Sequence, residues 1–214
     1  MRLPMTSIRG YADLLLKGAM GPVNEQQAEF LEVIRKNVNR MNGLVTGISD
    51  YAKIQAGRMT VNPTDSDLNG LLSESLAENE GVIAEFGAQV RVKAEASARL
   101  VKLDVDRFKQ VMGYLIDNAV RYGPAEEQVE LRVEDAGGFY KVVVEDEGFG
   151  IKPDDRAHVY EQFFRSEDER VRAQPGWGMG LTVSKALVEL MGGQIGFESK
   201  EGDGSVFWFT VGRG

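Results

Sequence analysis

The chain has 214 residues, of which 43% are hydrophobic and 27% charged, so it can form one large or two small domains with a buried core. Its formal charge of -8 argues against a nucleic-acid partner, because binding to a phosphate backbone depends on clustered Lys and Arg. The lack of Cys excludes disulfides and thiolate catalysis, and the single His excludes a His-rich metal centre, so any metal would take oxygen ligands.

No stretch approaches the roughly 20 apolar residues that cross a bilayer, and the first residues lack the apolar centre of a secretory signal. We therefore expect a cytoplasmic protein, with no transmembrane segment in this chain.

The first 57 residues predict a helical hairpin. Ile8, Ala12 and Leu15 mark a first helix, and Gly and Pro residues between 17 and 24 end it, with Asn24 as the expected cap of the next helix. Between residues 31 and 52 the apolar residues recur at alternating spacings of three and four, which is the pattern of a heptad seam. The seam consists of Leu31, Ile34, Val38, Met41, Val45, Ile48 and Ala52.

A hairpin of two helices cannot bury both this seam and its flanks by itself. We therefore expect two copies to pair into a four-helix bundle, which makes the protein a homodimer. The alternative is that the seam packs against the second domain of the same chain.

Residues 58–214 predict a second domain of mixed composition. Helical patterns cover residues 65–86, 104–122 and 179–191, with Thr64 or Asp65 as the expected cap of the first. Alternating patterns predict strands at 89–93, 129–133, 140–144, 195–199 and 206–211. The expected fold class is therefore α+β: a helical hairpin at 1–57, followed at 58–214 by an α/β sandwich whose helices cover one side of a mixed sheet.

Two glycine-rich segments of this domain suggest a ligand site. Asp146 ends an apolar strand, and Gly148 and Gly150 follow it, so a buried carboxylate there could accept from an exocyclic amine. The alternative is that this turn simply ends the strand. The segment 176–181 opens a helix, where backbone N–H groups can bind phosphate, but it is neither a dinucleotide fingerprint nor a Walker loop.

Three residues of the helix at 104–122 have matching chemistry. Asn118 and Tyr122 share one face. The Asn118 carbonyl suits Mg²⁺ when phosphates and waters complete the octahedron, Arg121 can neutralise phosphate, and the Tyr122 ring can contact a base. Each of the three residues alone is more often an ordinary surface or core position.

These motifs, read in order, resemble the catalytic core of bacterial sensor histidine kinases. Residues 104–122 look like the N box, 159–165 like the F box, and 146–151, 176–181 and 202–205 like the glycine boxes. The hairpin is similar to the dimerisation and phosphotransfer domain of that family. The resemblance implies a Bergerat-type ATP-binding sandwich, ATP and Mg²⁺ as cofactors, a mobile lid at 152–176 and a response regulator receiver domain as partner.

The resemblance also implies roles for individual residues. Asp146 would accept from the adenine amine, Asn118 would bind Mg²⁺, and Arg165 would reach the γ-phosphate. The expected ATP-binding residues are Asn118, Arg121, Tyr122, Asp146, Gly148, Gly150, Ile151, Arg165, Gly176, Gly178, Met179, Gly180, Leu181 and Ser205.

The sequence departs from the family pattern at three places. It begins with Met1-Arg-Leu-Pro just after the position of the phosphoacceptor His, so no catalytic residue is assigned, and the only histidine, His158, is expected on the lid surface. Leu3 stands where Thr or Asn is usual, which argues against phosphatase activity. Tyr114 replaces the first Asn of the N box, so we expect Mg²⁺ binding to persist while phosphoryl transfer becomes less efficient.

The predicted function is the ATP-binding core of a two-component histidine kinase, either a fragment of a longer sensor kinase or a natural truncation. Without the acceptor His, self-phosphorylation at the usual site is not expected. The alternative is a non-catalytic, ATP-regulated interaction module that acts on a response regulator or a kinase partner. A third possibility, an ATPase of the chaperone and mismatch-repair type, ranks lowest because those proteins have a carboxylate where Tyr114 stands.

Overall fold

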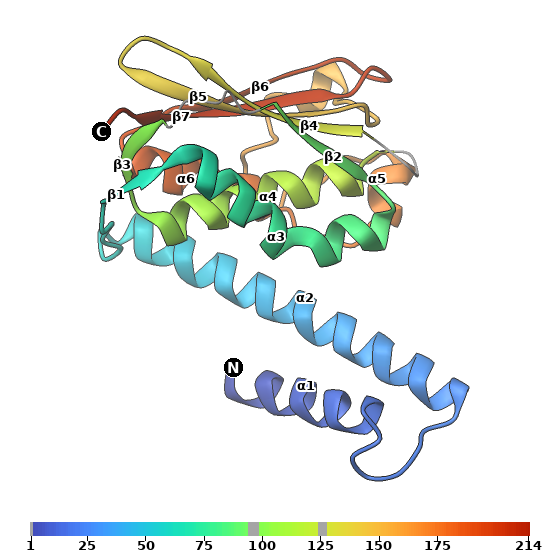
Figure 1. Ribbon diagram of the computed structural model, residues 1–214. Coiled ribbons are helices and arrows are strands. Elements are labelled where there is room, and N and C mark those ends of the chain that lie inside the picture. The colour runs from blue at the N-terminus through green and yellow to red at the C-terminus, as the bar shows by residue number, and fades with distance from the viewer. Residues whose placement is uncertain (1, 94–98, 124–127) are drawn as a thin grey trace. The chain divides into compact units, whose positions relative to one another are not determined.

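The computed structural model describes residues 2–93, 99–123 and 128–214, with side chains from residue 4 onward. The chain divides into two compact units, Met1–Ala52 and Lys53–Gly214, which are described separately below. Figure 1 labels their helices and strands. The predicted domain boundary at 57/58 stays a prediction.

The first unit is a hairpin of helices α1 (Arg2–Leu16) and α2, which continues past the unit boundary (Glu25–Gln55). After α1 the chain turns at Gly18, whose φ of 71° is the left-handed conformation that glycine adopts readily. Asn24 caps α2 as predicted: its Oδ1 accepts from the Gln27 amide at 2.8 Å, and the Gln27 side chain accepts from the Asn24 amide at 3.0 Å. This reciprocal cap explains why α2 begins six residues before the predicted heptad seam.

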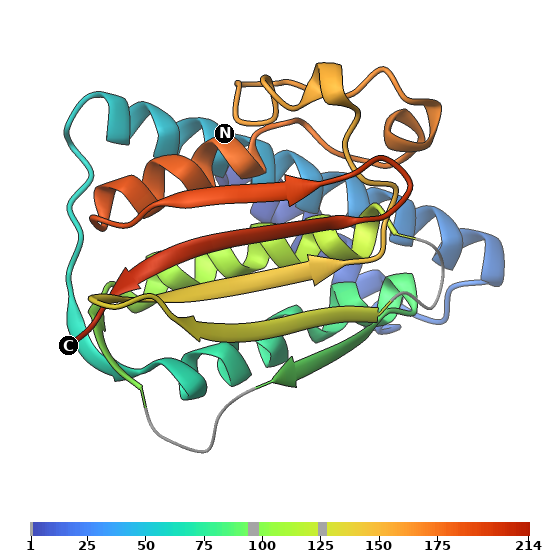
Figure 2. The ribbon, with the colours of Figure 1, turned by 90° about the horizontal axis from the view of Figure 1, so that it is seen from above.

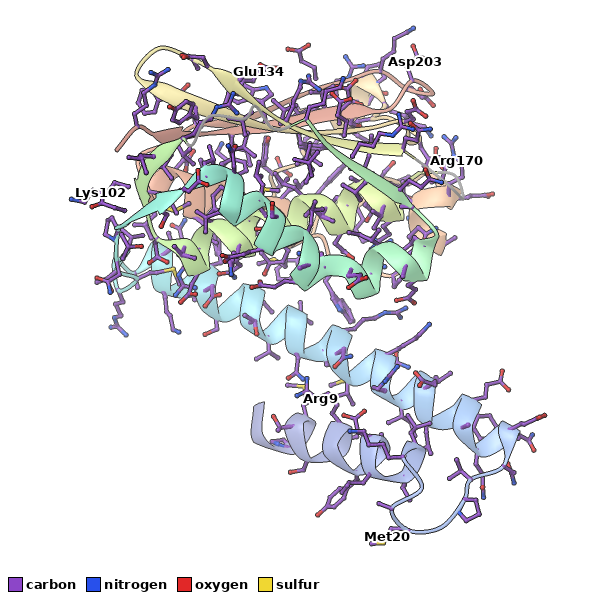
Figure 3. All side chains as sticks on the ribbon, viewed as in Figure 1. Arg9, Met20, Lys102, Glu134, Arg170 and Asp203 are labelled. Carbon is purple, nitrogen blue, oxygen red and sulfur yellow. The ribbon has the colours of Figure 1, made fainter. Side chains whose placement is uncertain are left out.

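The hairpin buries few of its apolar side chains. Met5, Ala12 and Val38 are buried, whereas three seam residues, Ile34, Met41 and Ile48, are 43%, 51% and 41% exposed. Other exposed apolar side chains of the hairpin are Ile8, Tyr11, Leu14, Phe30 and Val33. Met20, in the loop between the helices, is 83% exposed (Figure 3).

The second unit is built on a five-stranded sheet. Its strands, in spatial order, are β2 (Gln89–Lys93), β4 (Gln128–Asp135), β5 (Phe139–Asp146), β7 (Ser205–Gly212) and β6 (Ile195–Ser199). Strands β2 and β4 run parallel, and every other neighbouring pair in this sheet is antiparallel. The mixed sheet predicted from the sequence is therefore confirmed.

Helices α3 (Leu68–Phe86), α4 (Val105–Arg121) and α6 (Gly180–Leu190) cover one face of this sheet (Figure 2). The segment between β5 and α6 contains only a 3-10 turn (Pro153–Asp155) and the short helix α5 (Glu169–Ala173). The core lies between helices and sheet, where Phe108 of α4 meets Phe209 of β7 with ring centroids 5.6 Å apart. The predicted α/β sandwich with helices on one side is thus observed.

The predicted start of α3 was wrong. Residues Thr64–Asp67 form a short strand, β1, which pairs with β3 (Leu100–Leu103), and α3 begins only at Leu68. The cap is Asp67, whose carboxylate accepts from the amides of Asn69 and Gly70. The strand partner lies more than thirty residues further along the chain, so the local helical pattern gave no sign of it.

Candidate functional site

Asp146 ends strand β5 with its side chain buried and one of its two carboxylate oxygens hydrogen-bonded to backbone amides. Its Oδ1 accepts from the amides of Gly148 at 3.0 Å and Ser205 at 3.1 Å, and the residue is 9% exposed. Burial raises the pKa of Asp146 to about 6, although the two amide donors lower it in part. At neutral pH the group is largely ionised, with its second oxygen available to accept from a ligand amine.

The loop after Asp146 and the turn before β7 interlock through glycines. Gly150 has a φ of 64°, and a Cβ there would lie 2.0 Å from the carbonyl oxygen of Lys200; Gly204 has a φ of 86°, and a Cβ would lie 2.0 Å from the Asp146 carbonyl oxygen. A side chain at either position would therefore collide with backbone. Both glycines let backbone approach backbone and so hold Asp146 in place, while a direct role in ligand binding stays a prediction.

Ser199, at the end of β6, joins these two segments and was not identified from the sequence. Its hydroxyl accepts from the Ile151 amide at 2.8 Å and lies 2.9 Å from the hydroxyl of Ser205. Ile151 and Ser199 are 48 residues apart, and a serine at a strand end is too common to be a signal. The contact brings two of the predicted site residues, Ile151 and Ser205, to the same side chain.

One face of α4 lies along the segment 176–180. A Cβ on Gly176 would lie 3.6 Å from the Tyr122 hydroxyl, and a Cβ on Gly180 would lie 3.2 Å from the ring of Tyr114. Asn118 sits one turn from each tyrosine on that face, so it is between the two contacts. Tyr122 also accepts from the Phe149 amide at 3.0 Å through its carbonyl oxygen, which links this face to the loop after Asp146.

The start of α6 differs from the other helices of this unit. Asp67, Asp104 and Asp168 cap α3, α4 and α5 with their carboxylates. Met179 precedes α6 and provides no side-chain hydrogen bond to its first amides. A helix start without a capping side chain presents N–H groups and the positive end of the helix dipole, which suits phosphate oxygens.

The two arginines expected at the phosphates are engaged within the protein. Arg121 forms a two-pronged ion pair with Asp117, with Nε 3.1 Å from Oδ2, and its guanidinium lies 5.1 Å from the Phe86 ring centroid. Arg165 donates to the carbonyl oxygens of Gly176, Val171 and Gln174 at 3.0, 2.5 and 2.6 Å. Their contacts with phosphate stay predictions, which require both side chains to exchange partners.

Asp168 connects several parts of the segment 152–176 that was predicted as the lid. It caps α5, accepts from Lys152 at 3.0 Å and pairs with Arg170, which lies over the Phe149 ring. These donors, Arg170 first, hold the pKa of Asp168 well below its usual range. His158 lies on the surface of the lid with its Nδ1 2.9 Å from Glu161, as the sequence predicted.

A metal ion at this site would depend on the nucleotide. Among the described residues no group of three or more His, Asp or Glu side chains could hold a metal ion. Asn118 offers a single amide oxygen on the face of α4 that carries Tyr114 and Tyr122. That donor set fits Mg²⁺, which binds few protein ligands and keeps phosphates and waters in its octahedron.

Comparison with known families matches both units. The family described as "Histidine kinase-, DNA gyrase B-, and HSP90-like ATPase" matches residues 103–213. The family described as "His Kinase A (phospho-acceptor) domain" matches residues 1–57. The two matches lie in the order that the sequence motifs predicted.

Among curated proteins, the chain is similar to the circadian input-output histidine kinase CikA of Synechococcus elongatus, with 29% identity over 97% of this chain. It covers 28% of CikA. Across three of the curated relatives that it matches, the chain spans 23% to 51% of their length.

Solved structures share the fold. Full-length ShkA in complex with AMPPNP matches all of this chain at a TM-score of 0.78 and 24% identity, and the match covers 44% of ShkA. The histidine kinase ThkA in complex with the response regulator TrrA matches all of it at a TM-score of 0.67 and 21% identity, over 59% of that structure's chain.

Within the described residues, no helix is long and apolar enough to cross a membrane.

Proposed function

The chain belongs to the sensor histidine kinase family, and from that premise we propose that it binds ATP with Mg²⁺ and transfers the γ-phosphate to a histidine, for relay to a response regulator. The proposal rests on three features that lie close together. They are the buried Asp146 carboxylate with one oxygen available, the face of α4 that carries Asn118, and the start of α6, which has no capping side chain. AMPPNP bound to ShkA supports the choice of nucleotide.

In this proposal the base binds at the Asp146 end of the site and the phosphates at the α6 end. The free oxygen of Asp146 accepts from the adenine amine, and the Tyr122 ring contacts the base. The backbone at Gly178, Met179, Gly180 and Leu181 binds phosphate oxygens, while Asn118 donates its carbonyl oxygen to Mg²⁺. Gly148, Gly150, Ile151, Gly176 and Ser205 shape the pocket through the contacts described above.

Bound Mg²⁺ supplies charge neutralisation at the phosphates. The residues of the chain orient the triphosphate and exclude water, which is most of what a loose phosphoryl-transfer transition state requires. Arg121 would leave Asp117, and Arg165 would leave the lid carbonyl oxygens, to meet the phosphates. Because Arg165 holds the lid at Val171, Gln174 and Gly176, its exchange would rearrange the lid as ATP binds.

The helical hairpin would provide the dimer interface. Its seam residues Ile34, Met41 and Ile48 are 41–51% exposed in the single chain, and pairing with a second copy would bury them in a four-helix bundle. The ThkA complex with TrrA supports a receiver domain as the further partner. The one histidine of the chain, His158, lies in the segment 152–176 and not in the hairpin, so self-phosphorylation at the usual site is not expected from this chain.

Transfer of radiolabelled γ-phosphate tests the proposal. The chain, a version with Ser-His-Glu added before Met1, and an Asn118→Ala variant of that version would be incubated with ATP and Mg²⁺. We expect acid-labile label only on the extended chain with Asn118 intact. Binding of ATP without label on either form would favour the interaction module over the kinase. If ATP does not bind, both functions are excluded.

A further inference from the structure

Tyr114 departs from the family pattern and touches the start of α6. The residue lies on α4, and its ring is 3.2 Å from where a Cβ on Gly180 would stand. That distance is close enough that only a glycine fits without displacement. Gly180 is the first residue of α6, whose opening amides have no capping side chain. The aromatic ring therefore packs directly beneath the backbone that would bind phosphate.

The first turn of α6 is held from two directions. From the lid side, the Thr182 hydroxyl donates to the Glu161 carbonyl oxygen at 3.0 Å. From the α4 side, the Tyr114 ring lies under Gly180. Asp67, Asp104 and Asp168 hold the first turns of the other helices by capping them, but Met179 provides no capping side chain. The two contacts therefore hold the first turn of α6 in place of a cap. The arrangement leaves the first amides without a capping side chain while fixing where they point.

We propose that Tyr114 is a positioning residue for the nucleotide's phosphate tail, acting through packing of its ring against Gly180. The inference rests on the proposed function, since it requires that the site bind ATP. An asparagine, the usual residue of the family at this position, would share the Cβ and Cγ that lie near Gly180 but would lack the ring. The nearest atom, Cδ1, belongs to the ring, so Tyr114 places an apolar ring edge against the helix start where an asparagine would place a polar amide.

The proposal assigns Tyr114 to the phosphate end of the site only, so the test compares a ligand that uses both ends with one that uses mainly the base end. AMP depends mainly on the base end near Asp146, whereas ATP also uses the α6 amides. We would measure the dissociation constants of ATP and AMP, both with Mg²⁺, for the full chain and its variants by titration calorimetry or ligand-observed NMR. A loss of phosphate positioning lowers the ATP affinity and leaves the AMP affinity unchanged.

For Tyr114→Ala, which removes Cγ and the ring, we expect ATP affinity to fall about tenfold, the loss expected for one good hydrogen bond to a charged group. Tyr114→Asn keeps Cβ and Cγ, so we expect it to lose less ATP affinity than Tyr114→Ala. Tyr114→Phe keeps the ring and should bind ATP within about twofold of the original chain, if packing is what matters. The matched control is Tyr140→Asn, which changes a half-buried tyrosine at the opposite end of β5 from Asp146. That control should retain the ratio of ATP to AMP affinity.

A reciprocal substitution tests the same contact with Tyr114 intact. Alanine at position 180 would normally favour a helix over glycine, yet its Cβ would press on the Tyr114 ring. We therefore expect Gly180→Ala to lower ATP affinity alone. In a Tyr114→Leu background, where the ring is gone, the same Gly180→Ala change should cost less. Gly180→Ala also serves if Tyr114→Ala does not fold.

The outcomes are distinct. If the original chain binds no ATP, the proposed function fails before Tyr114 is at issue. If it binds ATP and the Ala and Asn variants bind it equally well, the positioning role is wrong. The role is also wrong if ATP and AMP affinities fall together, or if Tyr114→Phe loses as much as Tyr114→Ala, which would assign the effect to the hydroxyl.

Discussion

The two units of the molecule differ in how far they bury their apolar side chains. In the second unit, Phe108, Leu115 and Phe209 are almost fully buried between sheet and helices. In the hairpin, Phe30, Tyr11 and Met41 are more than half exposed. Burial of apolar surface is the main source of folding free energy. The sheet unit therefore contains its own core, whereas the hairpin has a surface that a second copy would complete.

The helix caps of the two units also differ in how far apart their hydrogen-bond partners lie in the sequence. Asp104 caps α4 and also accepts from the amide of Asn62, 42 residues away. In the hairpin, the cap at Asn24 is purely local, with both hydrogen bonds inside four residues. The long-range contact of Asp104 arises because the strands and helices of the sheet unit come from distant parts of the chain.

Two phenylalanines give the sharpest test of this contrast. Phe108→Ala empties a fully buried position and should cost about 3–5 kcal/mol of unfolding free energy. Phe30 is 60% exposed, and Phe30→Ala should cost well under about 1 kcal/mol in the monomer. Urea titrations followed by circular dichroism at dilutions that favour the monomer would measure both. Equal costs would contradict the comparison.

Charges placed in the hairpin seam should break the proposed dimer. The double variant Ile34→Asp, Met41→Asp buries two unpaired carboxylates in the bundle, and we expect dimer affinity to fall by roughly a hundredfold or more. Light scattering at micromolar concentration would show the change from dimer to monomer. Asn39→Asp adds a charge at an exposed position off the seam and should leave the dimer intact. A dimer that survives in the double variant would place the interface elsewhere.

Protonation of Asp146 should weaken nucleotide binding in acid. Its pKa is raised to about 6 by burial, so the acceptor oxygen is increasingly protonated below that pH. With one proton involved, affinity for adenine nucleotide should fall about tenfold between pH 7 and pH 5. The slope should be absent in Asp146→Asn, which titrates nothing at this position and controls for protonation of the phosphates. If affinity depends on pH equally in both proteins, Asp146 does not contact the base.

Folding stability should respond to the same group in the opposite sense. Because the folded pKa lies above the ordinary value of 3.8, the native state binds this proton more tightly than the unfolded chain. The Asp146 contribution to stability is therefore fully present below about pH 4 and is lost as pH rises to about 6. Unfolding titrations of the protein and of Asp146→Asn at several pH values would isolate it by difference.

The two helix caps test the contrast between local and long-range polar contacts. Asn24→Ala removes only a local cap and should cost about 0.5–1 kcal/mol. Asp104→Ala also leaves the Asn62 amide without its acceptor, so we expect a cost of about 2 kcal/mol. Thermal unfolding of the two variants, compared with the original chain, would rank them. The reverse order would mean that the long-range bond contributes little.

Much of this architecture was predictable because its signals are local. The start of α2 follows from the Asn24 cap, the strand at Ile195–Ser199 was predicted with its observed bounds, and α6 was predicted to within one residue at each end. Asp146 was identified from its place at a strand end followed by two glycines. Each of these depends on periodicity, capping or turn chemistry within a few residues.

From the sequence alone the class of fold was predicted correctly, as was the order of the elements apart from the short strands β1 and β3, while the roles of the site residues stay predictions. The tertiary structure alone decided that Thr64–Asp67 forms a strand, that Ser199 joins Ile151 to Ser205, and that the Tyr114 ring supports Gly180. It also decided that Arg165 holds the lid rather than pointing away from it. Except for the contacts of Arg165, which lie within one loop, these interactions join residues that are far apart in sequence. Which of several possible partners a side chain takes is set by packing, and no local pattern records that choice.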